Sequence, residues 1–272
     1  MKYCWFEAGG SPLFGEIEQR SGELWVIGLL SDPMALDPQR KGDVEESGTF
    51  EPRRLSELSL LPPVAPSKIV CVGRNYRDHA KELGNEVPTE PLLFFKPPSS
   101  LLPSGGVILM PPASERVDFE GELAVIIGKR ARKLSRHQDL DAYIHGFTIA
   151  NDVTARDLQK KDGQWTRAKG FDTFCPTGPV IETNLDISAI SAGLTLETRV
   201  NGEIRQRGST SDFIFALPEL LEYITAAMTL EPGDLILTGT PAGVGPLAPG
   251  DSVEISLAGI GNLTNTVAAD NH

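Results

Sequence analysis

The sequence predicts an α+β protein that is mostly β, with a mixed sheet rolled on itself. Short apolar runs recur at irregular spacing along the 272 residues, and most are too short to be helices. Pro-Gly-Asp turns at residues 232–234 and 249–251 lead directly into two of these runs. Segments with helical periodicity are few and short, which is unlike the regular alternation of a doubly wound sheet. The pattern therefore favours a β-roll over a parallel α/β fold.

A proline-rich stretch divides the chain. Residues 62–66 hold three prolines in five positions, which stiffen the backbone and stop both helices and central strands. Residues 1–61 alternate apolar runs with turn-rich stretches, notably the acidic 32–51, and predict a small β-rich N-terminal module. Residues 67–272 predict the main domain, because this length can bury one substantial core.

The main domain is predicted to hold many short strands and few helices. The predicted strands are residues 68–72, 92–95, 106–110, 117–127, 146–152, 178–182, 194–200, 234–238 and 252–257. The predicted helices are residues 75–83, 139–144, 154–161 and a segment within 212–228 that begins near Pro218. Asn201-Gly202 predicts a hairpin turn after the strand at 194–200.

Composition excludes several classes of partner. The net charge of -12 argues against nucleic acid, since binding to phosphates needs a basic face. The longest uncharged stretch, residues 97–114, is broken by prolines and glycines, so we expect no membrane helix. The N-terminus reaches an acid before any signal-peptide apolar run, and three cysteines without a Cys-x-x-Cys spacing suit a reducing compartment. We therefore expect a cytoplasmic protein.

Glu120 and Glu122 lie two residues apart in an apolar run. Because side chains alternate along a strand, both carboxylates should share one face, with stems about 6.5 Å apart. Asp152 ends a second apolar run and offers a third carboxylate. Buried like charges are costly without a cation, and the predicted strand has no lysine or arginine of its own. Oxygen ligands without a thiolate predict a divalent metal site that favours Mg²⁺ or Mn²⁺, with Ca²⁺ as a further option.

The same acids also have a purely structural interpretation. Glu120 would then lie at the rim of a strand, Glu122 would pair with an arginine elsewhere, and Asp152 would cap the helix that begins near Thr154. The three acids taken together favour the metal site.

His79 and Glu82 are predicted on one face of the helix at 75–83, since they are three residues apart. Glu82 would orient the imidazole while His79 takes a proton from water, which makes the pair a candidate general base. The alternative is an ordinary surface pair. A helix that opens directly after a strand is a common place for ligand-binding residues.

Two further segments offer groups for a substrate. Lys169 lies in a glycine-containing, turn-prone segment at 167–172 and could neutralise an oxyanion, or could be a solvated loop lysine. Residues 238–245 follow a buried strand and present backbone N–H groups and hydroxyls that could bind a carboxylate, or form an ordinary tight loop. Their glycine spacing does not match a phosphate loop.

Several motifs together resemble the fumarylacetoacetate hydrolase family in order and spacing, from about residue 66 to residue 267. They are Gly-Arg-Asn-Tyr-x-x-His-x-x-Glu, Phe-Phe-Lys-Pro, Asp-Phe-Glu-Gly-Glu-Leu, Ala-Asn-Asp-Val-Thr-Ala-Arg-Asp, Ala-Lys-Gly-Phe-Asp and Thr-Gly-Thr-Pro-Ala-Gly-Val-Gly. The resemblance implies a β-roll catalytic domain, usually in a homodimer.

The resemblance also implies roles for residues. It implies Mg²⁺ or Mn²⁺ on Glu120, Glu122 and Asp152, His79 with Glu82 as the water-activating pair, and Lys169 as an oxyanion partner. The substrate pocket would be lined by Arg74, Tyr76, Lys96, Gln159 and Thr240. The animal tyrosine-degrading enzyme has one more metal-binding aspartate where this chain has Val72, and its first domain is longer. The match is better with the acylpyruvate hydrolase, oxaloacetate decarboxylase and hydroxymuconate isomerase branch.

The expected function is metal-dependent hydrolysis of a C–C bond in a 2,4-dioxo acid, through a metal-bound enolate and water activated by His79. The alternative uses the same enolate without water. It would decarboxylate oxaloacetate, or catalyse a keto–enol or double-bond isomerisation such as that of 2-hydroxyhepta-2,4-diene-1,7-dioate or 5-carboxymethyl-2-hydroxymuconate. An alternative of another class is a non-catalytic scaffold that a metal ion stabilises.

Overall fold

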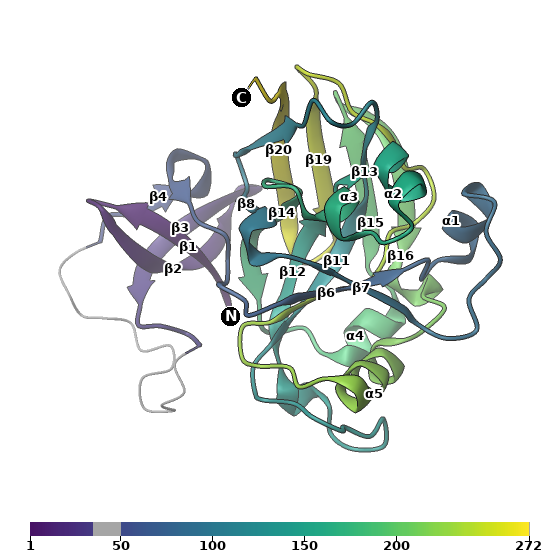
Figure 1. Cartoon of the computed structure of the whole chain (residues 1–272). Coiled ribbons are helices and arrows are strands. Elements are labelled where there is room, and N and C mark those ends of the chain that lie inside the picture. The colour runs from purple at the N-terminus through teal and green to yellow at the C-terminus, as the bar shows by residue number, and fades with distance from the viewer. Residues whose placement is uncertain (35–49, 272) are drawn as a thin grey trace.

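The computed structural model describes residues 1–34 and 50–271, and a long mixed sheet is its largest feature (Figure 1). The strands of this sheet run in the order β4 (Arg53–Arg54), β3 (Glu23–Leu30), β2 (Ser11–Arg20), β1 (Lys2–Ala8), β14 (Cys175–Glu182), β12 (Ile144–Asn151), β11 (Gly121–Ile127), β17 (Leu235–Leu237), β6 (Ile69–Gly73) and β7 (Leu92–Lys96), with β5 (Ser59–Leu60) paired to β1 and β8 (Leu101–Pro103) to β14. Pairing within the described part of this sheet is antiparallel except for β17 with β6 and β14 with β8. The mostly β, mixed architecture predicted from the sequence is confirmed.

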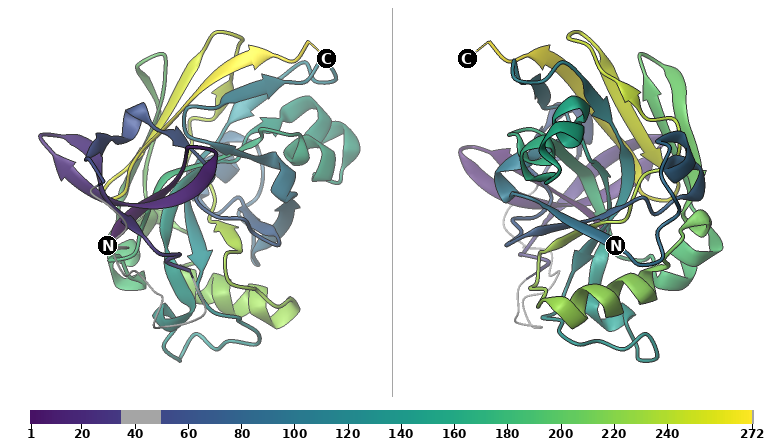
Figure 2. Two further views of the ribbon diagram at one scale, coloured as in Figure 1. Left: turned by 90° about the vertical axis from the view of Figure 1, so that its left-hand side faces the viewer. Right: turned by 45° about the vertical axis from the view of Figure 1, so that its right-hand side comes forward.

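A second sheet packs across the first and closes the roll (Figure 2). Its strands are β16 (Glu203–Ser209), β15 (Thr195–Val200), β19 (Ser252–Leu257), β20 (Gly261–Ala269) and β9 (Val107–Met110). A short third sheet holds β13 (Thr154–Ala155), β10 (Val117–Phe119) and β18 (Gly245–Pro246). The predicted turn at Asn201-Gly202 joins β15 to β16, and both residues have positive φ, 52° and 82°.

The helices are short and lie around the sheets (Figure 1). They are α1 (Arg77–Glu82), α2 (Arg156–Asp162), α3 (Thr166–Gly170), α4 (Ile187–Ala192) and α5 (Leu217–Ala227). Short 3-10 turns cover Leu55–Glu57, Pro98–Ser100, Asp141–Tyr143 and Thr210–Asp212. Pro218 lies in the first turn of α5, where its missing N–H costs nothing, as predicted.

Strand β11 is buried on both faces, which explains its continuous apolar sequence. Leu123 and Val125 share one core with Phe147 and with residues of the second sheet. Ala124 and Ile126 belong to a core on the opposite face of the large sheet. The strand therefore runs through the middle of the molecule, and polar groups at its first end are held rigidly.

Four local predictions need correction. The strand predicted at 117–127 is two strands, β10 and β11, separated at Glu120. The helix predicted at 139–144 was wrong: a 3-10 turn ends at Tyr143, and Ile144 already pairs with β11. The predicted helix at 154–161 begins only at Arg156, because the two residues before it pair with β10. Residues 167–172, predicted as a turn, include most of helix α3, which ends at Gly170.

The N-terminal strands extend the large sheet. Strand β1 pairs with β14 at Lys2↔Glu182 and Tyr3↔Ile181. Whether residues 1–61 form a separate module joined by a linker at 62–66 stays a prediction. Most of the acidic stretch predicted at 32–51 lies outside the described residues.

Two expectations from composition can be compared with the structure. Cys4, Cys71 and Cys175 are all buried, in keeping with a packing role. Among the described residues, no helix has the length and apolar character needed to cross a membrane.

Candidate active site

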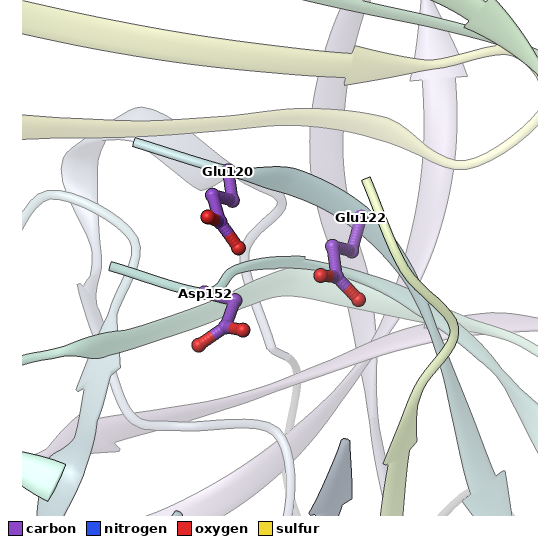
Figure 3. A group of neighbouring side chains, drawn as sticks. All are labelled: Glu120, Glu122 and Asp152. Atoms are coloured by element: carbon purple, nitrogen blue, oxygen red, sulfur yellow. The ribbon is translucent and has the colours of Figure 1, made fainter. Parts of the chain in front are cut away.

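The three predicted acids converge at one end of strands β11 and β12 (Figure 3). Glu120 precedes β11, Glu122 is the second residue of that strand, and Asp152 follows β12. Antiparallel pairing of Gly121 with Asn151 places them side by side. One carboxylate oxygen from each acid lies within 4.8 Å of the others, and all three residues are buried.

Local hydrogen bonds hold this end of the sheet. Glu120 N–H donates to Asn151 Oδ1 at 2.9 Å, and Asp152 N–H donates to Glu120 O at 2.8 Å. Gly121 N–H donates to Gln206 Oε1 at 3.0 Å, so the backbone between the two glutamates is tied to the second sheet. A Cβ atom at Gly121 would lie 2.3 Å from Thr198 Oγ1, so glycine is needed there for the two sheets to approach.

Basic side chains from other elements surround two of the acids. Lys169 Nζ donates to Asp152 Oδ2 at 2.5 Å and to Glu120 Oε2 at 2.9 Å. Lys96 Nζ donates to Asp152 Oδ1 at 2.6 Å, and Arg156 Nη2 donates to Glu120 Oε1 at 2.5 Å. The predicted strand has no basic residue of its own, but tertiary contacts from other elements neutralise part of the charge of Glu120 and Asp152. The structural alternative is also different in detail, since the arginine pairs with Glu120 and not with Glu122.

Glu122 lacks such a partner. Within residues 1–34 and 50–271 its carboxylate accepts one hydrogen bond, from Gly239 N–H at 2.6 Å, and forms no ion pair. Burial and the nearby Asp152 and Glu120 raise the pKa of Glu122 well above its usual value. Burial also opposes ionisation of Glu120, but Lys169, Arg156 and His79 outweigh it and lower the pKa of Glu120. The donor chemistry and the uncompensated Glu122 fit a hard divalent cation.

His79 and Glu82 lie together beside the acids, on α1. His79 is 4 % exposed, and its Nδ1 lies 3.5 Å from Glu82 Oε2. Burial lowers the pKa of His79, although Glu120 and Glu82 act in the opposite direction. Both oxygens of Glu82 accept from Gly243 N–H at 3.1 Å, which fixes the helix to the loop after β17. The two predicted residues therefore lie side by side, but His79 Nδ1 makes no hydrogen bond within the described residues, and the lowered pKa of His79 favours a neutral imidazole.

A cavity of about 540 Å³ contains the site. It is lined by the three acids, His79, Glu82 and Lys169, together with Arg74, Gln159 and Thr240. Arg74 is half-buried and forms no hydrogen bond or ion pair with the described residues. The Thr240 hydroxyl donates to Gly121 O at 2.8 Å and accepts from Gln206 at 2.7 Å, so it mainly holds the loop.

The structure does not bring Tyr76 and Lys96 to this cavity surface. Tyr76 is buried against Phe213, with ring centroids 5.3 Å apart, and lines a neighbouring depression. Lys96 is buried behind Asp152. Both were predicted to bind substrate, and that role receives no geometric support from their positions.

A larger groove of about 930 Å³ lies between the N-terminal strands and the turn before β20. Its lining includes Lys2, Glu23 and Glu197 but none of the clustered acids. Chemistry needs convergent reactive groups, so we place the candidate site in the smaller cavity.

Sequence reasoning missed Arg156, Asp118 and Trp165. Arg156 Nε donates to Asp118 Oδ2 at 2.9 Å and Nη1 donates to Gln159 Oε1 at 2.8 Å. Trp165 lines the cavity and packs edge-on against Phe94, with centroids 5.1 Å apart. The spacing of Arg156 and Gln159, three residues apart on a helix, is the one signal that could have identified this arginine.

Comparisons with known proteins agree with this geometry. The family model for the fumarylacetoacetate (FAA) hydrolase C-terminal domain matches residues 68–268. The chain is 46% identical to the oxaloacetate tautomerase of Bacillus subtilis over 237 residues, covering 82% of this chain and 77% of that protein. It is 46% identical to the mitochondrial oxaloacetate decarboxylase of Dictyostelium discoideum over 200 residues, covering 71% and 89%.

A solved structure shows the same fold over the whole chain. It is the 5-carboxymethyl-2-hydroxymuconate delta-isomerase of Mycobacterium smegmatis, with a TM-score of 0.85 and 38% identity, covering 99% of this chain and 100% of that one. The resemblance inferred from the motifs is confirmed, and the chain belongs to the fumarylacetoacetate hydrolase family of enzymes.

Proposed function

We propose that this enzyme interconverts the keto and enol forms of a 2-oxo dicarboxylic acid, with oxaloacetate as the substrate. The B. subtilis relative is named as an oxaloacetate tautomerase and the M. smegmatis structure as an isomerase. These names favour the alternative drawn from the sequence over the C–C bond hydrolase that we expected first. The observation that carries the proposal is the buried His79 beside three converging carboxylates in one cavity.

Glu120, Glu122 and Asp152 would hold a divalent ion, for which Mg²⁺ or Mn²⁺ suits three carboxylate ligands with room for water. When bound, such an ion polarises the carbonyl and carboxylate oxygens of a 2-oxo acid and makes the adjacent C–H group more acidic. The ion would compensate the charge of Glu122 most, because the described residues give this carboxylate no basic partner.

His79 would move the proton. Its Nδ1 faces Glu82, which leaves Nε2 as the nitrogen available to the cavity. A neutral imidazole would take a proton from C3 of oxaloacetate, the C–H electron pair would become the C2–C3 double bond, the π pair of the C2 carbonyl would move onto its oxygen, and the resulting imidazolium would return the proton to that oxygen. Lys169, whose pKa is raised by Asp152 and Glu120 against the effect of burial, stays cationic and stabilises charge near that oxygen.

Arg74 would bind a substrate carboxylate. Arg74 lines the cavity, is half-buried and has no acidic partner among the described residues. A partly desolvated guanidinium recognises carboxylates through paired hydrogen bonds. This supports a dicarboxylic substrate.

Decarboxylation of oxaloacetate is the second candidate, favoured by the relative from Dictyostelium discoideum. The C3–C4 bond breaks, its electron pair remains on the pyruvate enolate, and CO₂ leaves without attack by water. The same cavity residues would serve, so the products must decide.

The test is to incubate one preparation, supplied with Mg²⁺ or Mn²⁺, with oxaloacetate, acetylpyruvate and 5-carboxymethyl-2-hydroxymuconate, and to follow products by NMR. We expect faster keto–enol exchange of oxaloacetate than in buffer with the same ion. Pyruvate and CO₂ as the dominant products would favour decarboxylation, and acetate plus pyruvate from acetylpyruvate would favour the hydrolase. A protein that EDTA destabilises but that turns over none of the three would be the non-catalytic scaffold.

A matched pair of histidine variants tests the proposed base. His79→Gln should lower turnover by about 10²- to 10⁴-fold, the usual range for a lost general base. His137→Gln changes an exposed histidine outside the cavity and should leave turnover unchanged. Near wild-type activity of His79→Gln would remove His79 from the mechanism. The homodimer remains a proposal that light scattering can test.

A further inference from the structure

We propose that Asp118 is a positioning residue that, through Arg156, turns the amide NH₂ of Gln159 toward the substrate. The inference rests on the function proposed above for the same cavity, but its structural part can be tested separately. Asp118 is fully buried on β10, two residues before Glu120, and does not line the cavity. It can therefore act on a substrate only through another side chain.

Asp118 is held between two arginines. Arg116 Nε donates to Asp118 Oδ1 at 2.8 Å, and Arg116 Nη2 donates to Oδ2 at 3.1 Å. Arg156 Nε donates to the same Oδ2 at 2.9 Å. The carboxylate of Asp118 thus fixes one edge of the Arg156 guanidinium, while Glu120 binds another nitrogen.

Backbone pairing makes this arrangement rigid. Asp118 lies opposite Thr154 in the β10–β13 pair, and Arg156 N–H donates to Arg116 O at 2.8 Å. Arg156 itself is 4 % exposed. A planar guanidinium that is bound at Nε, Nη1 and Nη2 and is almost fully buried has little freedom to rotate.

The third contact decides the orientation of Gln159. Arg156 Nη1 lies 2.8 Å from the terminal side-chain atom of Gln159 that is assigned as Oε1. A guanidinium only donates hydrogen bonds, so the group that faces it must be the amide oxygen. The amide nitrogen of Gln159 must then take the other position, and Gln159 lines the cavity. The cavity therefore gains a fixed neutral donor for a carbonyl or carboxylate oxygen of the substrate.

Without Asp118, the orientation of the Gln159 amide is no longer fixed. Arg156 Nε would have no acceptor, the guanidinium could rotate about its remaining contacts, and the Gln159 amide could present its oxygen to the cavity instead. Partners of this indirect kind typically contribute about 10- to 100-fold to activity. We expect a loss of this size in kcat/KM for Asp118→Ala.

A double-mutant cycle on kcat/KM for oxaloacetate tests the coupling. If Asp118 acts through Gln159, Asp118→Ala should cost about 10- to 100-fold alone and nearly nothing in a Gln159→Ala background. Asp157→Ala is the matched control: Asp157 ties the same helix to the preceding segment through Ser114 and Glu115 but does not bond Arg156. Additive losses from Asp118→Ala and Gln159→Ala would overturn the proposal. A tenfold or greater loss of Mn²⁺ affinity in Asp118→Ala would also overturn it, because the route would then run through Glu120.

Two further readouts cover the cases in which turnover is absent or Asp118→Ala does not fold. With selective ¹⁵N labelling of glutamine, the Gln159 amide should give one resolved pair of signals in the wild-type chain and a shifted or broadened pair in Asp118→Ala; an unchanged pair overturns the proposal. If Asp118→Ala does not fold, Gln159→Glu tests the donor that Asp118 is proposed to position. It keeps an oxygen toward Arg156 and removes the donor, so we expect an unchanged melting temperature and at least a tenfold loss of kcat/KM, whereas full activity refutes the role. If the wild-type chain turns over no oxaloacetate, the proposed function fails, and the amide signals still decide the role of Asp118.

Discussion

Glu122→Gln should stabilise the metal-free protein and weaken its binding of a divalent ion. Glu122 is 2 % exposed, accepts one hydrogen bond from Gly239 and has no ion pair among the described residues. Glutamine has almost the same size and keeps an oxygen for the Gly239 N–H group. The substitution therefore replaces an acid whose ionisation is opposed by burial with a neutral side chain of nearly the same size, without opening a cavity.

The magnitude follows from that missing partner. A buried polar group left without its partner costs about 1 to 3 kcal/mol, and a charged group costs more. Removal of the Glu122 charge should recover about that amount in the metal-free protein. Each kcal/mol raises the unfolding temperature of a chain of this size by about 2 to 4 °C.

Glu120→Gln is the matched control and should have the opposite effect on the metal-free protein. Glu120 accepts hydrogen bonds from Lys169 and Arg156, at 2.9 and 2.5 Å. Loss of one partner from a buried ion pair leaves the other charge uncompensated and typically costs about 3 to 5 kcal/mol. The two substitutions, which hardly change side-chain size, thus compare the effect on stability of removing an unpaired carboxylate with that of removing a paired one.

Calorimetry measures both effects. Scanning calorimetry of EDTA-treated protein gives the unfolding temperatures, and titration with Mg²⁺ or Mn²⁺ gives ion affinity. Loss of a ligand should weaken ion binding by more than about 100-fold in either variant, since even partners behind the ligands contribute about 10- to 100-fold. If Glu122→Gln destabilises the metal-free protein as Glu120→Gln does, or if its ion affinity matches the wild type, the reasoning about this site is wrong.

Two further predictions concern stability. Asn75→Ala should lower the free energy of unfolding by about 3 to 5 kcal/mol, because each buried backbone group left unpaired costs about 1 to 3 kcal/mol. The fully buried Asn75 side chain pairs with Thr238 O, Phe215 O and Phe215 N–H. Urea denaturation measures the loss, and a value below about 1 kcal/mol would contradict this. Burial opposes ionisation of Asp234, but hydrogen bonds from Glu231, Lys68 and Ser67 outweigh it and lower its pKa. A lowered carboxyl pKa adds stability that is complete above the unfolded pKa of about 3.9 and is lost as the pH falls through the folded pKa. The difference in free energy of unfolding between wild type and Asp234→Asn should therefore shrink below about pH 4. A difference that does not change with pH would refute this role of Asp234.

The sequence could predict the acids of the site because strand periodicity is local. Glu120 and Glu122 lie at the start of an apolar run, where alternation along a strand is enough to place both carboxylates on one face, and Asp152 ends a second apolar run. The spacing of His79 and Glu82 likewise needs only one turn of helix. These predictions depend on neighbours within a few residues, where sequence patterns are informative.

The charges that surround the acids could not be predicted in the same way. Arg156 reaches Asp118 and Glu120 across 38 and 36 positions of the chain, and Lys169 reaches Glu120 across 49. No periodicity encodes such contacts, because they arise from the pairing of β10 with β13 and from the short helices that follow. The break of the predicted strand at Glu120 was missed for the same reason, since it is fixed by Asn151 on another strand.

The contact between Gly121 and Thr198 makes these two positions a single steric unit. Thr198 Oγ1 is buried and has no hydrogen-bond partner in the described part of the chain, and a methyl group at position 121 would lie only 2.3 Å from this oxygen. A residue larger than glycine at position 121 therefore requires a residue smaller than threonine at position 198, whereas glycine at 121 cannot be made smaller to accept a larger residue at 198. The spacing between the two glutamates is thereby governed by a neighbour that carries no reactive group.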